Sequence, residues 1–199
     1  MSPAGRVILL NGTSSSGKTT IARAFQRLAP DPWLRLGIDS FWGAVDGRWM
    51  EFGERASEGF RWVDRGERGF EIVPGEAGRR LASGMRAAVA AAARAGNDVI
   101  ADDVLLDQGW PAEWAAALAG LETLFVAVVV PIDVLEERER RRGDRILGES
   151  RAQVDVVHAG LSYDLQLDGT AGPERSAADI ESALESAPRP RALDRLRDP

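Results

Sequence analysis

Short, continuous apolar runs alternate along the chain with longer stretches in which apolar residues recur at helical spacing. Continuous apolar runs are typical of strands buried on both faces, and alternation with amphipathic helices is typical of a parallel sheet covered on both sides. The pattern therefore predicts an α/β fold. The expected strands span residues 6–10, 33–38, 98–101, 124–130 and 163–167, and the expected helices span 19–28, 75–95, 111–118, 132–142, 150–158 and 176–184. Ser150 is the expected N-cap of its helix.

The pattern contains neither an internal repeat nor a second core, so we predict a single domain over residues 1–187. Within it, residues 41–74 are irregular and rich in Gly, Trp and Arg, with a hairpin expected between residues 61–63 and 70–73. The Pro- and Arg-rich residues 188–199 are expected to be a disordered tail.

Composition narrows the functional classes. The chain has 199 residues, is 44% hydrophobic and carries a net charge of −6, which argues against a nucleic-acid or membrane-surface binder. It has no cysteine and one histidine, His158, so thiolate and histidine metal sites are excluded. Neither a secretory signal nor an apolar run of about 18 residues is evident, so we expect a cytoplasmic protein.

The strongest motif is Gly12-Thr13-Ser14-Ser15-Ser16-Gly17-Lys18-Thr19, which fits the phosphate-binding P-loop pattern between an expected strand and an expected helix. Lys18 is the only lysine among 25 basic residues, the others being arginines. A compact ammonium reaches between phosphate oxygens where a planar guanidinium is too wide. We expect Lys18 to contact the β- and γ-phosphates of ATP, Thr19 to bind Mg²⁺, and the loop together with Thr20 to hold the nucleotide.

Three aspartates follow expected strands, at the sheet edge where ligands bind in open α/β folds. Asp39 is the candidate general base for an attacking hydroxyl, with helix capping as the alternative. Asp102 and Asp103 are candidates for the metal site, and the sequence leaves open which of them serves it.

The arginine-rich segment from Arg138 to Arg145 has two interpretations. In the first interpretation, the arginines pair with neighbouring glutamates on a solvated helix face. A lid that brings guanidinium groups onto the transferring phosphoryl is the other, and the break at Gly143 favours it for Arg142 and Arg145. His158 is expected to be a packed side chain rather than a catalyst. The tryptophans of residues 41–74 either line an acceptor pocket or fill a loosely packed segment.

Taken together, several segments resemble the chloramphenicol phosphotransferase-like family of P-loop antibiotic O-phosphotransferases. The resemblance covers roughly residues 6–170 and rests on Ile8–Thr19, Pro30–Leu34, Gly37–Ser40, Ile100–Val104, Arg138, Arg142–Arg145, Val156–His158 and Tyr163–Asp164. It implies a five-stranded parallel sheet of order 2-3-1-4-5 flanked by helices, an acceptor-binding insertion at 41–74 and a lid at 138–153. It also implies that Asp39 is the base and that Arg138 and Arg142 lie by the substrates.

The resemblance implies transfer of the γ-phosphoryl of ATP to a hydroxyl of a small-molecule antibiotic. Residues 41–74 do not match the chloramphenicol enzyme well, so the acceptor is either chloramphenicol or another natural product, such as a nucleoside antibiotic. A small-molecule kinase of primary metabolism and a nucleotide-binding regulator without transfer are the alternatives, and a homo-oligomer is possible.

The expected catalytic residues are Lys18, Asp39, Arg138 and Arg142. ATP is expected on Gly12, Thr13, Ser14, Ser15, Ser16, Gly17, Lys18, Thr19, Thr20, Arg142 and Arg145, and Mg²⁺ on Thr19, Asp102 and Asp103.

Overall fold

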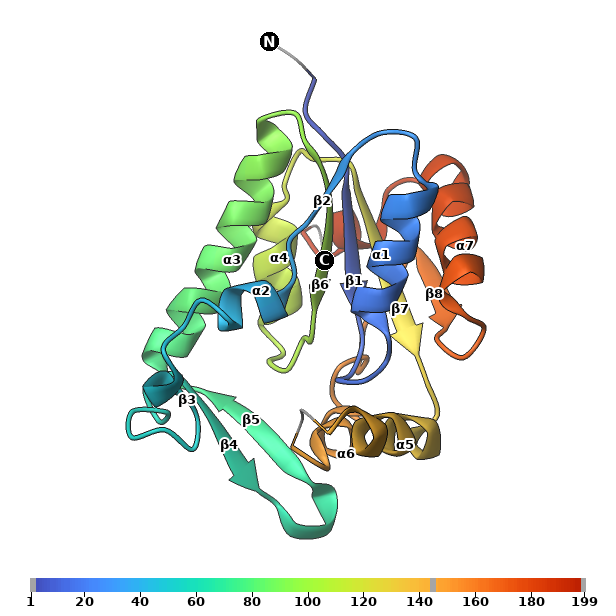
Figure 1. Ribbon diagram of the computed structural model, residues 1–199. Coiled ribbons are helices and arrows are strands. Elements are labelled where there is room, and N and C mark those ends of the chain that lie inside the picture. The colour runs from blue at the N-terminus through green and yellow to red at the C-terminus, as the bar shows by residue number, and fades with distance from the viewer. Residues whose placement is uncertain (1–2, 144–145, 198–199) are drawn as a thin grey trace.

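A five-stranded parallel sheet forms the centre of the molecule (Figure 1). The computed structural model describes residues 3–143 and 146–197. In spatial order the strands are β2 (Trp33–Arg35), β6 (Asp98–Asp103), β1 (Val7–Asn11), β7 (Thr123–Val129) and β8 (Leu165–Asp168). Numbered among themselves along the chain, these strands have the order 2-3-1-4-5. The predicted sheet and its order are confirmed.

Helices cover both faces of this sheet because successive strand residues point to opposite sides. Val7 and Leu9 pack in the core shared with three helices, whereas Ile8 and Leu10 pack in the core on the other face. On the first face lie α3 (Glu76–Arg94), α4 (Trp110–Ala117) and α8 (Ala192–Arg195), and on the second lie α1 (Lys18–Leu28) and α7 (Pro173–Ser186). None of the described helices is both long and apolar enough to cross a bilayer.

The register of the strands brings three loops together at one edge. Asn11, the last residue of β1, lies opposite Asp103 on β6 and Ala127 on β7. The chain leaving β2 stays beside β6, because the Leu36 amide donates to the Ile100 carbonyl at 3.1 Å. The segments that follow β1, β2 and β6 therefore meet, as the carboxyl ends of parallel strands do.

Residues 41–74 form a second, smaller sheet beside this edge. It contains β3 (Met50–Glu51), β4 (Phe60–Asp64) and β5 (Phe70–Pro74) in that order, with β4 and β5 antiparallel. The predicted hairpin is thus confirmed. Two 3-10 turns, Gly47–Trp49 and Gly66–Arg68, complete the segment. Figure 1 shows the hairpin extending beyond the central sheet towards α5 (Ile132–Arg142) and α6 (Glu149–Gln153).

Several predicted boundaries are wrong, among them the end of the helix expected at 150–158, which is α6 and ends at Gln153. The strand expected at 33–38 ends at Arg35, and α2 (Ile38–Trp42) follows with Gly37 as its N-cap. The apolar run continues across this break, so the pattern alone did not reveal it. Ser150 is not an N-cap, because Gly148, at φ 97°, caps α6 and Ser150 lies inside the helix.

The expected disordered tail is also wrong for the residues described here. Helix α8 packs against the α3 and α4 side of the core, with Leu193 only 1% exposed. Its start is fixed by the Ala192 amide, which donates to Asp164 at 2.7 Å. The local composition suggested a frayed C-terminal segment, but the burial of Ala192 and Leu193 holds this segment against the core.

Replacing Leu193 with alanine is therefore expected to lower the free energy of unfolding by about 2–4 kcal/mol, the cost of a cavity at a buried leucine. Urea denaturation of the purified protein measures this. The control is Leu28→Ala, since Leu28 is 44% exposed and its loss should cost about 1 kcal/mol or less. Equal effects of the two substitutions would show that α8 is not part of the core.

Candidate active site

The loop from Gly12 to Thr19 joins β1 to the start of α1 and has the conformation of an anion cradle. Ser15 and Gly17 have positive φ angles of 61° and 98°, so the backbone turns sharply before the helix. A side chain at Gly12 would place its Cβ 2.7 Å from the Val128 carbonyl oxygen, which explains glycine there. The hydroxyls of Ser15 and Ser16 are buried and make no hydrogen bond within the described residues. The loop thus offers donors, at the positive end of a helix, to an anion.

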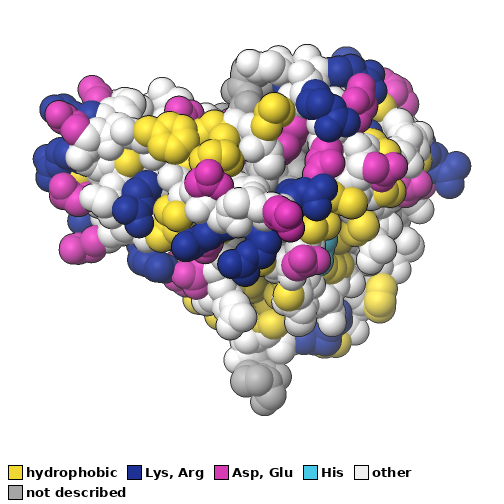
Figure 2. All heavy atoms as spheres, turned by 90° about the horizontal axis from the view of Figure 1, so that it is seen from below, with side chains coloured by type: hydrophobic (Ala, Val, Ile, Leu, Met, Phe, Trp, Pro, Cys, Tyr) yellow, Lys and Arg dark blue, Asp and Glu magenta, His cyan; other side chains and the backbone are white. Residues whose placement is uncertain are grey.

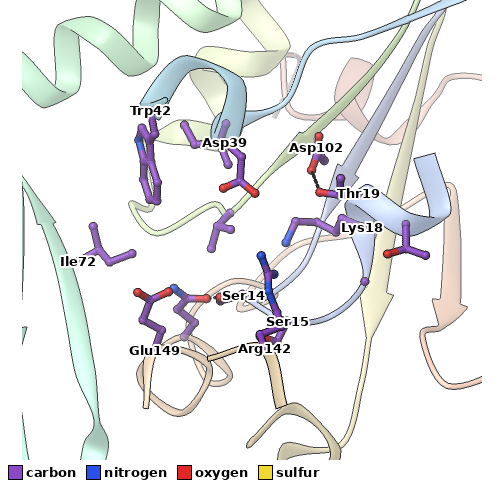
Figure 3. Close-up of a pocket in the computed structure, with 15 residues that line it drawn as sticks. Ser14, Ser15, Lys18, Thr19, Asp39, Trp42, Ile72, Asp102, Arg142 and Glu149 are labelled. Carbon is purple, nitrogen blue, oxygen red and sulfur yellow. Dashed lines mark hydrogen bonds between the residues drawn. The ribbon is translucent and has the colours of Figure 1, made fainter. Parts of the chain in front are cut away.

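The ammonium of Lys18 is folded back onto its own loop. Nζ donates to the carbonyl oxygens of Gly12 and Thr13, both at 2.7 Å, and the residue is 7% exposed. Lys18 lines a pocket together with Thr19, Asp39 and Arg142 (Figure 3). A single buried ammonium therefore lies where the loop meets the pocket.

Thr19 and Asp102 form a direct link between α1 and β6. The Thr19 hydroxyl donates to Asp102 Oδ2 at 2.7 Å, and both residues line the same pocket (Figure 3). The other carboxylate oxygen, Oδ1, is buried without a hydrogen bond within the described residues, and Arg35 Nη1 lies 3.9 Å from it. A hydroxyl bonded to a buried carboxylate is a ligand arrangement that suits a hard cation.

Asp103 lies apart from this pair, because the next residue of a strand faces the opposite side of the sheet. Its carboxylate accepts hydrogen bonds from Trp114 Nε1 and from the Val104 amide, both at 2.8 Å. Burial raises the pKa of this carboxyl, while the bond from Trp114 and the charge of Arg86 oppose that rise. Asp103 is 1% exposed and does not line the pocket, so the structure separates the two aspartates that the sequence treated as a pair.

Asp39 enters the same pocket from α2, in the first turn of that helix. Figure 3 shows its carboxylate beside the Trp42 ring on one side of the pocket, with Lys18 and Thr19 approaching from another. The alternative role of Asp39 as a helix cap does not apply, since Gly37 is the N-cap. The candidate base and the candidate phosphate-binding lysine therefore share one pocket, although they come from different elements.

The described arginines between residues 138 and 142 make three kinds of contact. Arg138 donates to the carbonyl oxygens of Ser16 at 3.1 Å and Gly169 at 2.8 Å, so it braces the loop from below. Arg140 and Arg141 pair with Glu137 on the exposed face of α5, which confirms the solvated-helix interpretation for these two. Figure 2 shows this end of the molecule, where arginines and acidic side chains are interspersed. Arg145 lies outside the described residues.

Arg142 is the arginine that borders the pocket, and it also borders two neighbouring hollows. One of these lies between α1, α5 and the loop after β8 and includes Arg138, Gly169, Thr170 and Pro173. The other lies between α2 and the small sheet and is lined by Asp39, Trp42, Met50, Trp62, Ile146 and Glu149. Arg142 therefore lies where three cavities meet.

Sequence reasoning missed two buried residues of this site, Glu149 and Gln153. Both line the pocket, with exposures of 3% and 2%. Trp62 Nε1 donates to Glu149 Oε1 at 2.5 Å, and Gln153 Oε1 accepts the Ser14 amide at 2.6 Å. The only signal in the sequence was their spacing of four residues, which places them on one face of a helix.

His158, Tyr163 and Asn11 form a polar cluster behind the loop. His158 Nδ1 lies 2.8 Å from the Tyr163 hydroxyl, and Asn11 Nδ2 donates to that hydroxyl at 2.8 Å. Burial lowers the pKa of His158 and raises that of Tyr163 to about 12. As expected from the sequence, His158 is a packed side chain.

The neutral state of His158 in the folded protein has a measurable consequence. A base whose pKa is lowered by folding contributes stability above its unfolded pKa of 6.5, and this stability is lost as the pH falls through the folded value. Because the chain has one histidine, NMR of its ring protons measures the folded pKa directly. We expect a midpoint below 6.5, and a His158→Gln variant should lose less stability between pH 6.5 and 5 than the wild type. A midpoint at or above 6.5 would contradict the assignment.

The sheet order and the loop after its central strand define the fold class of the P-loop kinases. The APS kinase CysC of Mycobacterium tuberculosis, solved with AMPPNP and APS, superimposes with a TM-score of 0.66 at 18% identity, covering 92% of this chain and 99% of that one. The tunicamycin resistance protein of Deinococcus radiodurans superimposes with a TM-score of 0.63 at 16% identity, covering 91% and 96%. At these identities the likeness shows the fold.

Sequence comparison identifies the family. A family described as chloramphenicol phosphotransferase-like protein matches residues 5–185. Proteins provisionally named O-phosphotransferases, from two strains of Mycobacterium tuberculosis, are 34% identical over 98% of this chain and 89% of their own length. The chain belongs to the chloramphenicol phosphotransferase-like family, and it is a phosphotransferase of the kinase type. Nucleotide binding with a metal ion is general in this fold class.

Proposed function

We propose that this protein transfers the γ-phosphoryl group of Mg²⁺-bound ATP to a hydroxyl of a small natural product. The observation that carries the proposal is the shared pocket of Lys18, Thr19, Asp39 and Arg142, which joins a phosphate-binding loop to a carboxylate suited to act as a base. Transfer between bound partners requires the donor and the acceptor to meet in line at such a place.

On the donor side, the loop adjoins a hollow that would take the rest of the nucleotide. The loop amides and Lys18 would hold the phosphates, as helix N-termini do. The nucleobase would occupy the hollow between Arg138, Thr170 and Pro173, which begins at Gly17 and Thr20 of the loop and helix. In this arrangement Arg138 would hydrogen-bond the loop and line the nucleobase site, while Arg142 would contact the phosphates of the nucleotide.

The residues present fit a magnesium ion. Thr19 would supply its hydroxyl, and Asp102, which accepts that hydroxyl through Oδ2, would hold the hydration shell. The described residues contain no group of three or more acidic or histidine side chains that could hold a metal ion, so phosphate oxygens and water would complete the coordination. When bound, the ion supplies positive charge that neutralises the phosphate oxygens. Asp103 has no part in this site.

The chemistry on the acceptor side follows from the position of Asp39. Its carboxylate orients the acceptor hydroxyl and accepts the proton as the new O–P bond forms, while the bond from the γ-phosphorus to the bridging oxygen of ADP breaks. Lys18 and Arg142 stabilise the negative charge on the transferring group. The lid formed by residues 138–153 excludes water, which favours transfer over hydrolysis.

The hollow between α2 and the small sheet suits an acceptor with a ring. Trp42, Met50, Trp62 and Ile146 supply an apolar wall, and Asp39, Glu51 and Glu149 supply carboxylates. Apolar walls with a few polar groups bind compounds that combine a hydrophobic body with hydroxyls. The family name and the name of the structurally similar tunicamycin resistance protein of Deinococcus radiodurans both support an antibiotic as the acceptor, and a resistance role would follow.

A screen by mass spectrometry tests this proposal. The protein is incubated with Mg²⁺ and ATP and with two sets of acceptors, namely hydroxylated antibiotics and hydroxylated primary metabolites. We expect a product heavier by one phosphoryl group in the first set. Products confined to the second set would instead identify a metabolic kinase, and ATP binding without product in either set would favour a regulator.

A further inference from the structure

Helix α6 is hydrogen-bonded to both halves of the proposed site. It is a helix of five residues, Glu149–Gln153, and it lies between the phosphate-binding loop and the small sheet. Figure 3 shows Glu149 on the side of the pocket that faces Ile72 of β5, while Ser14 approaches from the loop. The contacts at its two ends are specific enough to argue a role for this helix.

At one end, α6 contacts Ser14 of the phosphate-binding loop. The Ser14 amide donates to Gln153 Oε1 at 2.6 Å, and the Ser150 hydroxyl lies 3.0 Å from the Ser14 carbonyl oxygen. Both the N–H and the C=O of Ser14 are thus in contact with one helix. Gln153 and Ser150 are 2% and 0% exposed, so these bonds are shielded from water.

At the other end, α6 is joined to the acceptor side. Trp62 of β4 donates its indole N–H to Glu149, and the Phe70 amide donates to the Gly148 carbonyl at 3.2 Å. A Cβ at Gly69 would lie 2.0 Å from the Gly148 carbonyl oxygen, so the two backbones are in direct contact. The Trp62 ring packs on Trp42, with centroids 5.6 Å apart, and Trp42 follows Asp39 on α2.

Helix α6 is also fixed at its first turn, by Glu139 of α5. The buried carboxylate of Glu139 accepts the Gly148 amide at 2.9 Å and the Ser150 amide at 2.7 Å, so it caps the first turn. A short helix that is bonded at both ends and capped has little freedom to absorb a displacement internally. A shift of Ser14 is therefore passed on to Glu149 and to the Trp62 indole.

We infer that α6 couples the nucleotide site to the acceptor pocket, with Gln153 and Glu149 as positioning residues. This inference rests on the proposed function, because it assumes that the loop binds a nucleotide. Binding of phosphates to the loop moves Ser14, and α6 adjusts the tryptophan wall beside Asp39. By reciprocity, an acceptor against Trp62 strengthens nucleotide binding.

The test follows the indole resonances of the protein by ¹H–¹⁵N NMR during titration with Mg²⁺–AMPPNP. The Trp62 resonance is assigned with a Trp62→Phe variant. The resonance of Trp114, whose indole N–H is bonded to Asp103, is the internal reference. In the wild type, we expect the nucleotide analogue to shift the Trp62 resonance and to leave that of Trp114 in place.

The decisive variant is Gln153→Met, which keeps the length of the side chain and removes the acceptor for the Ser14 amide. We expect it to bind AMPPNP while its Trp62 resonance no longer responds. Gln166→Met, at an exposed position of β8, is the matched control and should behave as the wild type. If Gln153→Met does not fold, as judged by the Trp114 resonance, Ser150→Ala replaces it and should weaken the response.

The outcomes separate the two claims. A Trp62 shift of full size in Gln153→Met, or in Ser150→Ala where that variant replaces it, would overturn the coupling. So would a wild type that binds AMPPNP without any Trp62 shift. Failure of the wild type to bind AMPPNP at all would instead contradict the proposed function.

Discussion

Replacing Asp39 with asparagine is expected to reduce phosphoryl transfer by about 10²–10⁴-fold, the usual contribution of a positioned general base. Asparagine has nearly the same shape but does not accept the proton of the attacking hydroxyl. Asp39 is exposed on the acceptor side of the pocket, whereas the phosphate contacts come from the loop, so the affinity for the nucleotide should change little. Initial rates with a fixed acceptor, together with calorimetric titration of Mg²⁺–AMPPNP, measure both quantities.

The matched control for this substitution is Asp133→Asn, an exposed aspartate in the first turn of α5 that borders none of the three cavities. It should retain the rate of the wild type. Transfer within a few fold of the wild type in Asp39→Asn would remove Asp39 as the base. A loss of nucleotide affinity equal to the loss of rate would indicate that Asp39 acts through the donor site instead.

Replacing Lys18 is expected to damage both nucleotide binding and turnover. Its ammonium is 7% exposed and lies against two loop carbonyls, so it is held where phosphate oxygens would approach. Loss of one such preorganised charge costs about 10²–10³-fold in turnover, and the ground-state affinity falls as well. Lys18→Met should show both losses in the rate assay and in the AMPPNP titration.

Lys18→Arg makes the sharper test, because it keeps the positive charge. A planar guanidinium is wider than an ammonium and does not reach between phosphate oxygens in the same way. We expect arginine to rescue neither binding nor turnover, which would account for the one lysine in a chain otherwise rich in arginine. Arg27→Met, at an exposed site on the same helix, is the control. Full activity of Lys18→Arg would mean that charge alone suffices.

The parts of the fold that follow from local sequence were predictable. The strands at 6–10, 98–101 and 124–130 are continuous apolar runs because they are buried on both faces, and the loop motif between a strand and a helix indicated the candidate donor site. The resemblance to the family then gave the order of the strands. Features that are encoded by neighbouring residues could therefore be predicted from the sequence.

The parts that depend on tertiary contacts were not predictable. The alternation of strand residues places Asp102 and Asp103 on opposite faces, but only the position of α1 decides which of them meets Thr19. Helix α6 has five residues and no apolar periodicity, so its bonds to Ser14 and Trp62 have no local signature. The burial of Leu193 is likewise a property of the assembled core.

The central claim is that the γ-phosphoryl group goes to a hydroxyl and not to water. It is tested most directly by ³¹P NMR of the wild-type protein with Mg²⁺, ATP and the hydroxylated antibiotics as acceptors. The account predicts a new phosphomonoester resonance that grows in step with ADP and is absent in Asp39→Asn. Formation of ADP with inorganic phosphate alone, or ATP that remains intact with every acceptor, would contradict it.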